Sequence, residues 1–501
     1  MNLLYRTPTK ARLWLAVTVY AGALMLPAGY QMTEVNEAGQ EMSQWLYKML
    51  SPYQLRETTM ISIWTFTVSC HIVGEVFGSL IATLIGDKIS RKDLMCISVL
   101  PMVLGDILSF LAKPTQILWF LAVGRTISAL SDGIGWPSLA VYLSEVAPIN
   151  KRAPLFAAYQ LIREFGLLLG MLVGMPGLLG TADLWHYIFL VSALISLLFA
   201  PFTVLFPRTG RYLLTKRRDR QAAEASVAFF QGANSEFDEM YRRLELEKIE
   251  TQTFNTSLFH EARRHKCAIL LTLCFSCSIG TCGRLVLVSY SVDLGHSLGL
   301  AYGSAQTVGL VAQIVSIFVC LVNTCVVERF GRRTIFSAAG ITTVFLQLWI
   351  TAALFVRYFG VNQPFFIYSG AGAIVLWTSV VLSGLTSLNF VATELLPQRL
   401  RSIGFAFYNI LQCVIGGLRT QFFPVLEHIH LGYGMLFLFI PFLISTILVI
   451  LYLPETKNRS LEEVQDLLNP SRIQICRNRA LSEENLPLIS RAQRSVKTHY
   501  I

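Results

Sequence analysis

The stretch Glu145-Val146-Ala147-Pro148-Ile149-Asn150-Lys151-Arg152 lies where a long apolar segment meets a short basic loop. A second stretch has the same pattern far downstream, Glu394-Leu395-Leu396-Pro397-Gln398-Arg399-Leu400-Arg401. Glutamate, proline and arginine occupy the same three places in both, each displaced by 249 positions (394−145, 397−148, 401−152). A polar motif repeated at that distance in an apolar chain indicates two copies of one membrane unit.

The composition is that of a membrane protein. Of the 501 residues, 53% are hydrophobic and only 14% are charged, whereas about a quarter of the residues in a soluble domain are charged. The apolar residues form runs of about 20, the length that a helix needs to cross a bilayer. The net charge of +10 comes from cations in short loops beside these runs, which is the pattern of cytoplasmic loops and not of a nucleic-acid surface.

The apolar runs predict an all-α integral membrane protein with twelve transmembrane helices in two homologous six-helix bundles. The basic loops lie at 87–93, 149–153, 328–333 and 398–401, and the alternate loops are poor in cations. Basic loops face the cytoplasm, so both termini are expected on that side. The predicted spans are 12–32, 59–86, 94–112, 117–144, 153–176, 184–206, 267–292, 303–327, 334–356, 365–393, 402–426 and 432–453.

Four regions are expected along the chain. Residues 1–206 form the first six-helix bundle, and residues 267–454 form the second. Between them, residues 207–266 break the apolar pattern and read as a cytoplasmic loop with short amphipathic helices. Residues 455–501 form a cytoplasmic tail that is polar and mixed in charge, with an end from about Ser471 that is expected to be disordered.

Two further motifs recur between the halves. The run from Asp87 to Lys92 matches Glu328 to Arg333, a displacement of 241 positions (328−87), and Pro207-Arg208-Thr209-Gly210-Arg211 matches the run from Pro454 to Arg459, a displacement of 247 (454−207). Three nearly equal displacements indicate homologous bundles related by an axis along the membrane normal, with a substrate cavity between them.

These motifs resemble those of the major facilitator superfamily and, within it, the sugar porter family that includes the facilitative glucose transporters. The most specific marks are Gly124-Arg125, the pattern Tyr142-x-x-Glu145-x-x-Pro148-x-x-x-Arg152, the Glu328–Arg333 run and the run from Leu453 to Glu463. Ala28-Gly29-Tyr30-Gln31 with Asn36 is similar to the end of the family's first helix. The resemblance covers nearly the whole chain to about Leu468.

The resemblance implies a cytoplasmic gate. In this family, Glu145 and Glu394 would bind arginines of the Arg91 and Arg332 loops while the gate is shut, and opening would break the ion pairs. The alternative is that these arginines only set the orientation in the membrane, but that role would not need glutamates at matched positions. The expected gate residues are Asp87, Arg91, Lys92, Arg125, Glu145, Arg152, Glu328, Arg332, Arg333, Glu394 and Arg401.

The sugar-binding positions of the family are largely replaced. By the motif alignment, the fifth-helix glutamine falls on Glu164 and the eighth-helix asparagine on Ser316, while the seventh-helix amides fall near Ile279, Gly280 and Leu285. An apolar side chain leaves a sugar hydroxyl unpaired, which costs about 1–3 kcal/mol. The remaining candidates for solute binding are Tyr30, Gln31, Gln160, Glu164, Arg284, Gln313, Asn389 and Asn409, each weighed against a role in helix packing.

Several ionisable residues fall inside the apolar runs, where each is expected to have a partner or a function. Arg125 and Asp132 are seven residues apart on one helix, about 10 Å, so each is expected to pair across helices. The neighbours Arg163 and Glu164 point about 100° apart and cannot face each other. The full set is Glu75, Asp106, Arg125, Asp132, Arg163, Glu164, Arg284 and Arg419.

The expected function is a membrane transporter that moves a small polar solute, a sugar or sugar-like molecule, by alternating access. Gln31 stands where proton-linked sugar porters carry an aspartate, which favours facilitated diffusion, although Asp132 or Glu164 could carry a coupling proton. The plasma membrane is the expected location. Besides the solute and the bilayer, no nucleic acid or other partner is implied.

Two alternatives remain at this stage. One is an organic-ion carrier of the same fold, which the charged interior favours and the short first external loop, about Thr33–Glu57, disfavours. The other is a solute sensor that does not transport. An enzyme is not expected, because there is no phosphate loop or nucleophile with a base. No cofactor or metal is expected either, since Cys274-x-x-Cys277 has no second pair of ligands.

Overall fold

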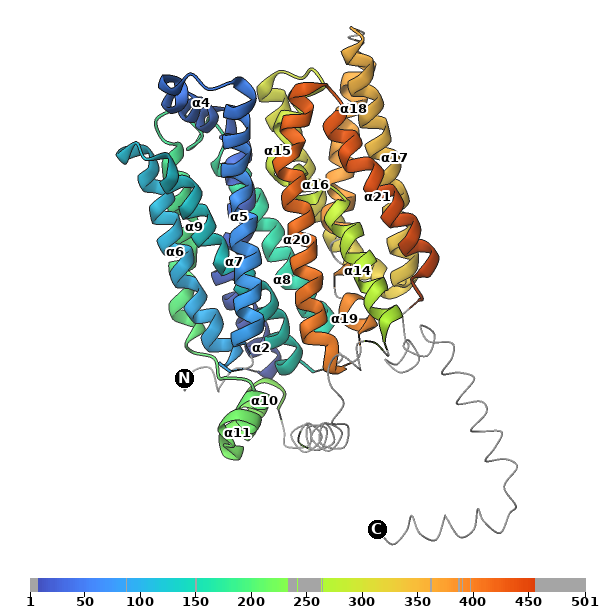
Figure 1. Cartoon of the computed structure of the whole chain (residues 1–501). Helices are drawn as coiled ribbons and strands as arrows, with labels where there is room; N and C mark the ends of the chain where they lie inside the picture. Colours follow the sequence, from blue (N-terminus) through green and yellow to red (C-terminus); the bar gives the residue numbers. More distant parts are fainter. Residues whose placement is uncertain are drawn as a thin grey trace, which may run out of the picture.

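The computed structural model describes most of the chain as helices. The described residues are 8–86, 88–148, 151–232, 241, 263, 265–360, 363–385, 388–389, 391–396 and 398–455. The helices run side by side in two groups (Figure 1). Two short helices, α10 (Gly210–Tyr212) and α11 (Arg220–Phe230), lie at one end of the molecule, and α4 (Gly39–Leu50) lies at the other. We call these the α11 end and the α4 end.

The first group corresponds to the six spans predicted before residue 206. Its first span consists of α2 (Thr9–Tyr20), the π-helical segment η1 (Ala21–Met25) and α3 (Leu26–Glu37). The other bounds are α5 (Glu57–Ile85), α6 (Arg91–Thr115), α7 (Leu118–Val146), α8 (Arg152–Val173), the short η4 (Trp185–Tyr187) and α9 (Ile188–Thr203).

The second group begins with α14 (Lys266–Thr281) and α15 (Arg284–Ser297), which form one broken span. It continues with α16 (Tyr302–Phe330), α17 (Arg332–Tyr358), α18 (Pro364–Ser379) with η6 (Val380–Leu385) and α19 (Val391–Leu395), α20 (Gln398–Ile429) and α21 (Tyr433–Tyr452). Together the groups give the all-α membrane architecture that the sequence predicts.

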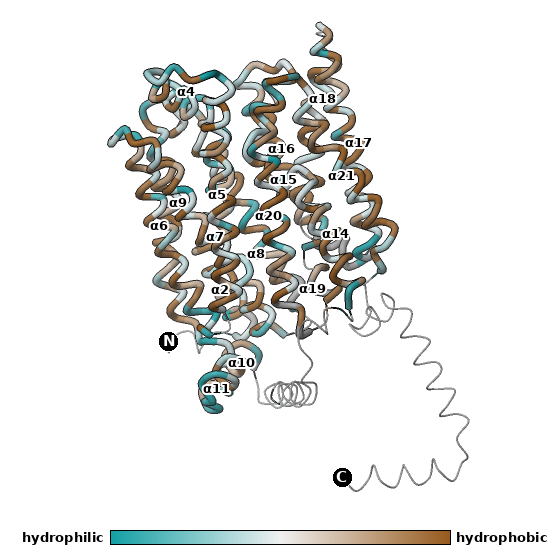
Figure 2. Tube along the Cα trace, in the orientation of Figure 1, coloured by the Kyte–Doolittle hydropathy of each residue, from teal (hydrophilic) through white to brown (hydrophobic). Residues whose placement is uncertain are grey.

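The outer surface of the bundle is apolar, as a bilayer requires. Large side chains such as Phe77, Leu100, Phe318 and Phe345 are more than half exposed. Figure 2 shows hydrophobic residues over most of both groups, with hydrophilic residues gathered toward the two ends. Ten of the described helices are long and apolar enough to cross a membrane by composition. The helices α7 and α20 complete the twelve predicted spans, and both carry buried charged residues.

The first span is longer than predicted, and the segment after it is not a simple loop. The helix continues through Thr33 to Glu37, because that polar stretch is buried against neighbouring helices and does not face lipid. The helix α4 then packs its buried residues Met42, Leu46 and Leu50, spaced four apart, onto the bundle. This corrects the prediction of a loop over 33–57.

The interdomain region is only partly described. The helix α11 begins at Arg220, where the Asp219 side chain accepts a hydrogen bond from the backbone N–H of Ala222 at 3.0 Å. Its buried face carries Ala223, Val227 and Phe230. Most of the expected amphipathic segment after 232, and the expected tail after 455, lie outside the described residues.

The broken span in the second group is held together by side chains from three other helices. The chain turns at Gly283, whose φ of +88° is accessible to glycine at little cost. The break frees backbone carbonyls from helical hydrogen bonds. The Cys282 carbonyl accepts from Gln347 Nε2 at 3.1 Å and from Trp377 Nε1 at 3.2 Å, and the Thr281 carbonyl accepts from Arg419 Nη1 at 3.0 Å.

Arg419 is therefore a structural cation. Its side chain is buried, and Nη1 also donates to the Leu438 carbonyl at 3.0 Å. The guanidinium lies over the Phe437 ring, 5.3 Å from the ring centre, which is within the distance of about 6 Å at which a cation and an aromatic ring attract each other. No carboxylate forms an ion pair with Arg419 within the described residues. The carbonyls at the end of α14 carry the negative end of the helix dipole, which compensates its charge.

We predict that Arg419→Met lowers the midpoint of thermal unfolding in detergent by several degrees, because two buried carbonyls lose a donor and each loss costs about 1–3 kcal/mol. The control is Arg357→Met, which removes a cation from the α4 end of the same group, where Arg357 contacts the His296 carbonyl at 3.4 Å near the surface. Equal midpoints for the two variants would show that Arg419 does not hold the break.

Candidate functional site

The two groups meet around Glu164, deep in the molecule. Glu164 lies on α8 of the first group and is 1% exposed. Its carboxylate accepts from Gln160 Nε2 at 3.1 Å on its own helix, and from Gln313 Nε2 at 3.0 Å on α16 of the second group. Ser316 Oγ lies 3.4 Å away on the same side. The structure thus joins three of the predicted solute-binding residues, Gln160, Glu164 and Gln313, across the interface.

This cluster can bind hydroxyl groups. A carboxylate accepts hydrogen bonds at two oxygens, and the amides of Gln160 and Gln313 both donate and accept. Gln313 Oε1 is buried and has no hydrogen-bond partner. Within the described residues, no ion pair neutralises Glu164. The hydrogen bonds that its carboxylate accepts from described residues come from amide and hydroxyl donors, so the site can exchange them for bonds to a solute.

Arg284 is the first residue of α15, directly after the break at Gly283, and its side chain is partly buried. Its charge acts on Glu75 and Glu164 of the first group. Asn389 accepts a hydrogen bond from Tyr408 at 2.7 Å, and Asn409 Nδ2 is buried without a partner. These three residues belong to the second group and remain candidates for solute contact.

Tyr30 and Gln31 face away from the second group, which corrects their assignment as solute-binding residues. The Tyr30 hydroxyl donates to the Ile188 carbonyl at 2.9 Å, and the side chain is fully buried. Gln31 Nε2 donates to Asp106 at 2.8 Å and lies 3.4 Å from Ser192 Oγ. Both residues lie on the face of α3 that packs against α6 and α9, so they stabilise the first group.

Arg125 does not lie near the expected gate, which corrects its assignment there. It is eight residues into α7, near the α4 end, and Glu145 follows 20 residues later (145−125), about 30 Å along the helix. Arg125 Nη1 donates to Glu34 Oε1 at 2.7 Å, and both side chains are at most 4% exposed. Arg163 pairs with Asp132 at 3.4 Å. As predicted, Arg125 and Asp132 each form an ion pair with a residue on another helix.

Sequence reasoning missed Glu34 because the polar stretch after Met32 was assigned to a loop. The signal was present, since Gln31 and Glu34 are three residues apart and share a helix face if the helix continues. It also missed His71, a buried histidine four residues before Glu75 on α5. Four-residue spacing places these two side chains one turn apart.

At the α4 end, hydrogen bonds close the space between the two groups. Asn36 Nδ2 donates to Ser291 Oγ at 2.8 Å. The Glu37 carbonyl accepts from Gln306 Nε2 at 3.1 Å and from the Tyr302 hydroxyl at 3.3 Å. These contacts join α3 of the first group to α15 and α16 of the second, so the α4 end is shut in this conformation.

Apart from Arg125, the expected gate residues whose side chains the structure describes lie at the α11 end. Lys92 Nζ donates to the carbonyls of Val204, at 2.8 Å, and Phe206. The Glu455 carboxylate accepts from the backbone N–H groups of Arg332, at 2.9 Å, and Arg333, at 3.1 Å, and thereby caps α17. Arg91 Nη1 contacts the Ala82 carbonyl at 3.4 Å.

The rest of the expected gate is described less completely. Glu145 is the next-to-last residue of α7, and it is partly buried. Asp87 lies outside the described residues. The backbone of four others is helical, but their side chains lie outside what the structure describes: Arg152, Glu328, Glu394 and Arg401.

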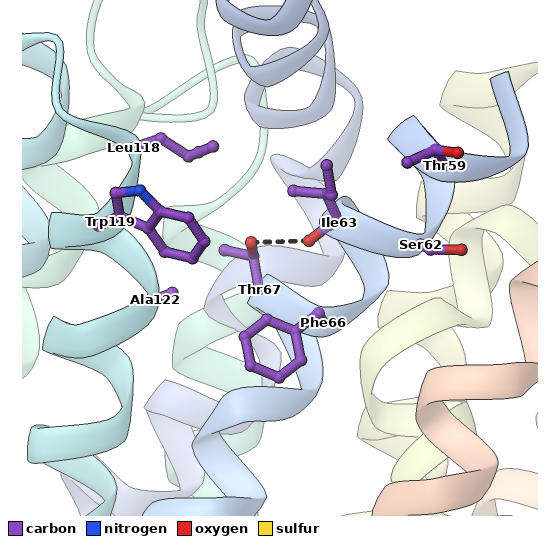
Figure 3. Close-up of a pocket in the computed structure, with 8 residues that line it drawn as sticks. All are labelled: Thr59, Ser62, Ile63, Phe66, Thr67, Leu118, Trp119 and Ala122. Atoms are coloured by element: carbon purple, nitrogen blue, oxygen red, sulfur yellow. Dashed lines mark hydrogen bonds between the residues drawn. The ribbon is translucent and has the colours of Figure 1, made fainter. Parts of the chain in front are cut away.

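A separate apolar pocket lies away from this interface. Figure 3 shows it between α5 and α7 near the α4 end, with Phe66 and Trp119 among its walls. Its volume is about 180 Å³. Phe66 is 48% exposed and Trp119 64%, so the pocket opens on the outer surface of the bundle. It contains none of the predicted solute-binding or gate residues.

The chain resembles known transporters over most of its length. It is 24% identical to the mouse solute carrier family 2, facilitated glucose transporter member 7, over 81% of this chain and 80% of that protein. It is 24% identical to facilitated glucose transporter protein 1 of Caenorhabditis elegans, with 87% of each covered. With mouse facilitated glucose transporter member 5 the identity is 25%, over 90% of this chain and 91% of that protein.

Solved structures show the same fold. A proton:xylose symporter of the major facilitator superfamily, bound to 6-bromo-6-deoxy-D-glucose, aligns with a TM-score of 0.75 at 16% identity. The alignment covers 92% of this chain and all of the symporter. An inward-open xylose transporter from E. coli aligns with a TM-score of 0.70 at 17% identity, over 91% of this chain and 98% of that one.

The family model described as sugar (and other) transporter matches residues 15–468, nearly the whole helical part of the chain. With the twelve-span fold, the two groups and the repeated motifs, this match identifies the chain as a member of the sugar (and other) transporter family.

Proposed function

We propose that this protein moves a small hydroxyl-rich solute, a sugar or sugar-like molecule, across a membrane by alternating access between its two helix groups. The observation that carries the proposal is the Glu164 cluster, where polar side chains of both groups meet inside an otherwise apolar bundle. Polar groups at this depth are costly and usually serve function. The names of the relatives, glucose and xylose transporters, support the same solute class.

The hydrogen bonds at Glu164 can couple solute binding to the movement of the two helix groups. When the groups separate, Gln313 moves away from Glu164 and both lose a partner. A solute with several hydroxyls can replace those bonds, since each hydroxyl donates and accepts. Binding then stabilises a state with the groups apart on one side, and closure over the solute restores a fully paired interface.

A second candidate solute is an organic cation or an amine-bearing sugar. Glu164 carries a carboxylate where the family has an amide, and no arginine or lysine forms an ion pair with it in the described residues. A cationic group on the solute would neutralise it directly. A neutral hexose would need only hydrogen bonds to Glu164, whereas a cationic solute would also need its negative charge.

We propose facilitated diffusion as the mode of transport, because Gln31 cannot carry a proton and its amide is used within the first group. A coupling proton remains the alternative. The buried pair of Glu34 and Arg125 would be its site, since Glu34 is the carboxylate that faces an arginine at 2.7 Å near the α4 end. The plasma membrane, with the α11 end and both termini in the cytoplasm, completes the proposal.

Reconstitution into proteoliposomes tests the solute class. We predict saturable uptake of hexoses or pentoses, and that Glu164→Gln raises KM by about ten- to a hundredfold because one charged hydrogen-bond partner is worth about 1.5–3 kcal/mol. If the solute is a cation, Glu164→Gln abolishes its uptake and spares neutral sugars. The matched control is Glu224→Gln, an exposed residue of α11 that pairs only with Arg220 of its own helix turn.

The outcomes separate the alternatives. Uptake that follows an imposed pH gradient would replace facilitated diffusion by proton coupling. Binding of sugar without uptake would identify a sensor. If no sugar and no organic cation is bound or transported, the proposed solute class is wrong.

We also propose that Glu145 and Glu394 form the gate at the α11 end with arginines of the Arg91 and Arg332 loops. The support is the repeat itself, since both glutamates occupy matched positions at the end of a helix and before a basic loop. An ion pair that forms only when the groups approach would hold this end shut and release it when the groups part.

We predict that Glu145→Gln and Glu394→Gln each slow turnover more than they weaken solute binding, because the gate acts on the conformational step and not on the site. Turnover is measured by solute exchange in proteoliposomes, and affinity by equilibrium binding in detergent. Glu224→Gln again serves as the control. Unchanged turnover in both variants would reduce these glutamates to markers of membrane orientation.

A further inference from the structure

Three potential metal ligands from two helices converge inside the first group. His71 and Glu75 lie one turn apart on α5, and Asp132 lies on α7. One ligand atom of each residue lies within 4.8 Å of the corresponding atom of the other two. His71 is 4% exposed and Asp132 is 1% exposed, while Glu75 is partly buried.

Each of the three has a buried polar atom without a hydrogen-bond partner. These atoms are Nε2 of His71, Oε2 of Glu75 and Oδ1 of Asp132. An unsatisfied buried polar group costs about 1–3 kcal/mol, so native structures rarely leave several together. Three such atoms in one place are the arrangement expected of a site that receives a ligand.

We propose that His71, Glu75 and Asp132 form a binding site for a divalent first-row transition-metal ion, with Zn²⁺ as the reference ion. An imidazole nitrogen with two carboxylate oxygens is a ligand set that Zn²⁺ and its neighbours accept, whereas Mg²⁺ and Ca²⁺ prefer oxygen ligands alone. No metal site is predicted from the sequence, because the cysteine spacings by which zinc sites are recognised play no part in this one. The site lies outside the Glu164 cluster and goes beyond the proposed transport of a solute.

The geometry requires only small side-chain movements. Zinc–ligand bonds are about 2.1 Å, so tetrahedral ligand atoms lie about 3.4 Å apart, and separations of up to 4.8 Å must shorten by about 1.4 Å at most. The helices themselves cannot drift apart easily. A methyl group on Gly133 of α7 would lie 2.1 Å from the Glu75 carbonyl, and one on Gly78 would lie 2.3 Å from the Leu130 carbonyl. This close packing fixes the backbone of both helices beside the site.

Arg163 of α8 holds one side of Asp132. Its Nη2 lies 3.4 Å from Asp132 Oδ2, and Oδ1 is left without a partner. A donor that holds one carboxylate oxygen in this way orients the other oxygen toward a bound metal ion. Two other side chains also hold the Arg163 guanidinium in place. It lies 4.6 Å from the centre of the Trp136 ring and 3.1 Å from Met32 Sδ.

The cations around the site affect how tightly a metal ion binds. With neutral imidazole and two ionised carboxylates, the ligand set carries a formal charge of −2, and Arg163 already offsets one unit of it through its ion pair with Asp132. Arg284 acts on Glu75 from across the interface between the groups, so its positive charge competes with the ion. Removal of the Arg284 charge is therefore expected to strengthen binding of the ion.

The test is binding of Zn²⁺ to the full-length protein purified in detergent with an affinity tag that contains no histidine. We expect one equivalent of Zn²⁺ to bind by calorimetry and to raise the unfolding midpoint, with Mg²⁺ giving neither effect. Co²⁺ at the same site should show visible d–d absorption that Zn²⁺ displaces. Glu75→Gln and His71→Ala should each weaken binding by about tenfold or more.

The Arg284→Gln variant provides the sharpest discrimination, because it should tighten Zn²⁺ binding by about tenfold if the arginine competes with the ion. His186→Ala is the matched control, since His186 stacks on Phe110 near the α4 end, away from the site. The proposal is overturned if the wild-type protein binds no stoichiometric Zn²⁺, or if Glu75→Gln and His186→Ala bind it equally well. These readouts do not depend on transport, so a failed uptake assay leaves them intact.

Discussion

The requirement that a charge inside a bilayer be neutralised at close range shapes the first helix group. Arg125 pairs with Glu34 and Arg163 pairs with Asp132, so α7 is tied by charge to α3 and is held by α8 on its other side. Removing one partner of a buried pair leaves a bare charge and costs about 3–5 kcal/mol. The two pairs therefore join three helices into one unit, which is what a bundle needs if it is to move as a single body.

In the second group, backbone carbonyls compensate a buried charge, that of Arg419. Its broken span exposes carbonyls, and Arg419, Gln347 and Trp377 donate to them from separate helices. The two groups are homologous in their motifs and differ in how their interiors are stabilised. At their interface, a single carboxylate, Glu164, accepts hydrogen bonds from both groups, and this makes it the point at which motion and solute binding can affect each other.

Much of the fold could be predicted from the sequence, and less of the site. Apolar runs and the repeated Glu-x-x-Pro motif predict twelve spans in two groups because they follow directly from the length and charge rules of a bilayer. The same rules predict that the first span ends at Met32, since they assume that polar residues lie outside the membrane. Thr33–Glu37 instead stays helical because neighbouring helices bury it, which no single-segment pattern reveals.

The candidate solute residues divide for a similar reason. Tyr30 and Gln31 lie next to each other on the first span, and both face α6 and α9. Which face of a helix meets the interface depends on its rotation in the bundle, and a sequence with apolar residues on all sides does not specify that rotation. Gln160, Glu164 and Gln313 were found because they are polar within strongly apolar runs, although nothing in the sequence indicated that they touch.

The way in which Arg419 is neutralised has a consequence for how this chain can change over evolutionary time. An ion pair such as Glu34 with Arg125 can be exchanged, because a substitution in one residue can be compensated by a substitution in the other. Arg419 relies on the carbonyls of Thr281 and Leu438, and a carbonyl is present whatever the side chain. No compensating substitution at 281 or 438 is needed to keep these carbonyl acceptors, and none could supply them. Substitutions at 281 and 438 therefore act on the packing of those side chains and leave the two carbonyl acceptors in place, whereas loss of the arginine removes the donor to both.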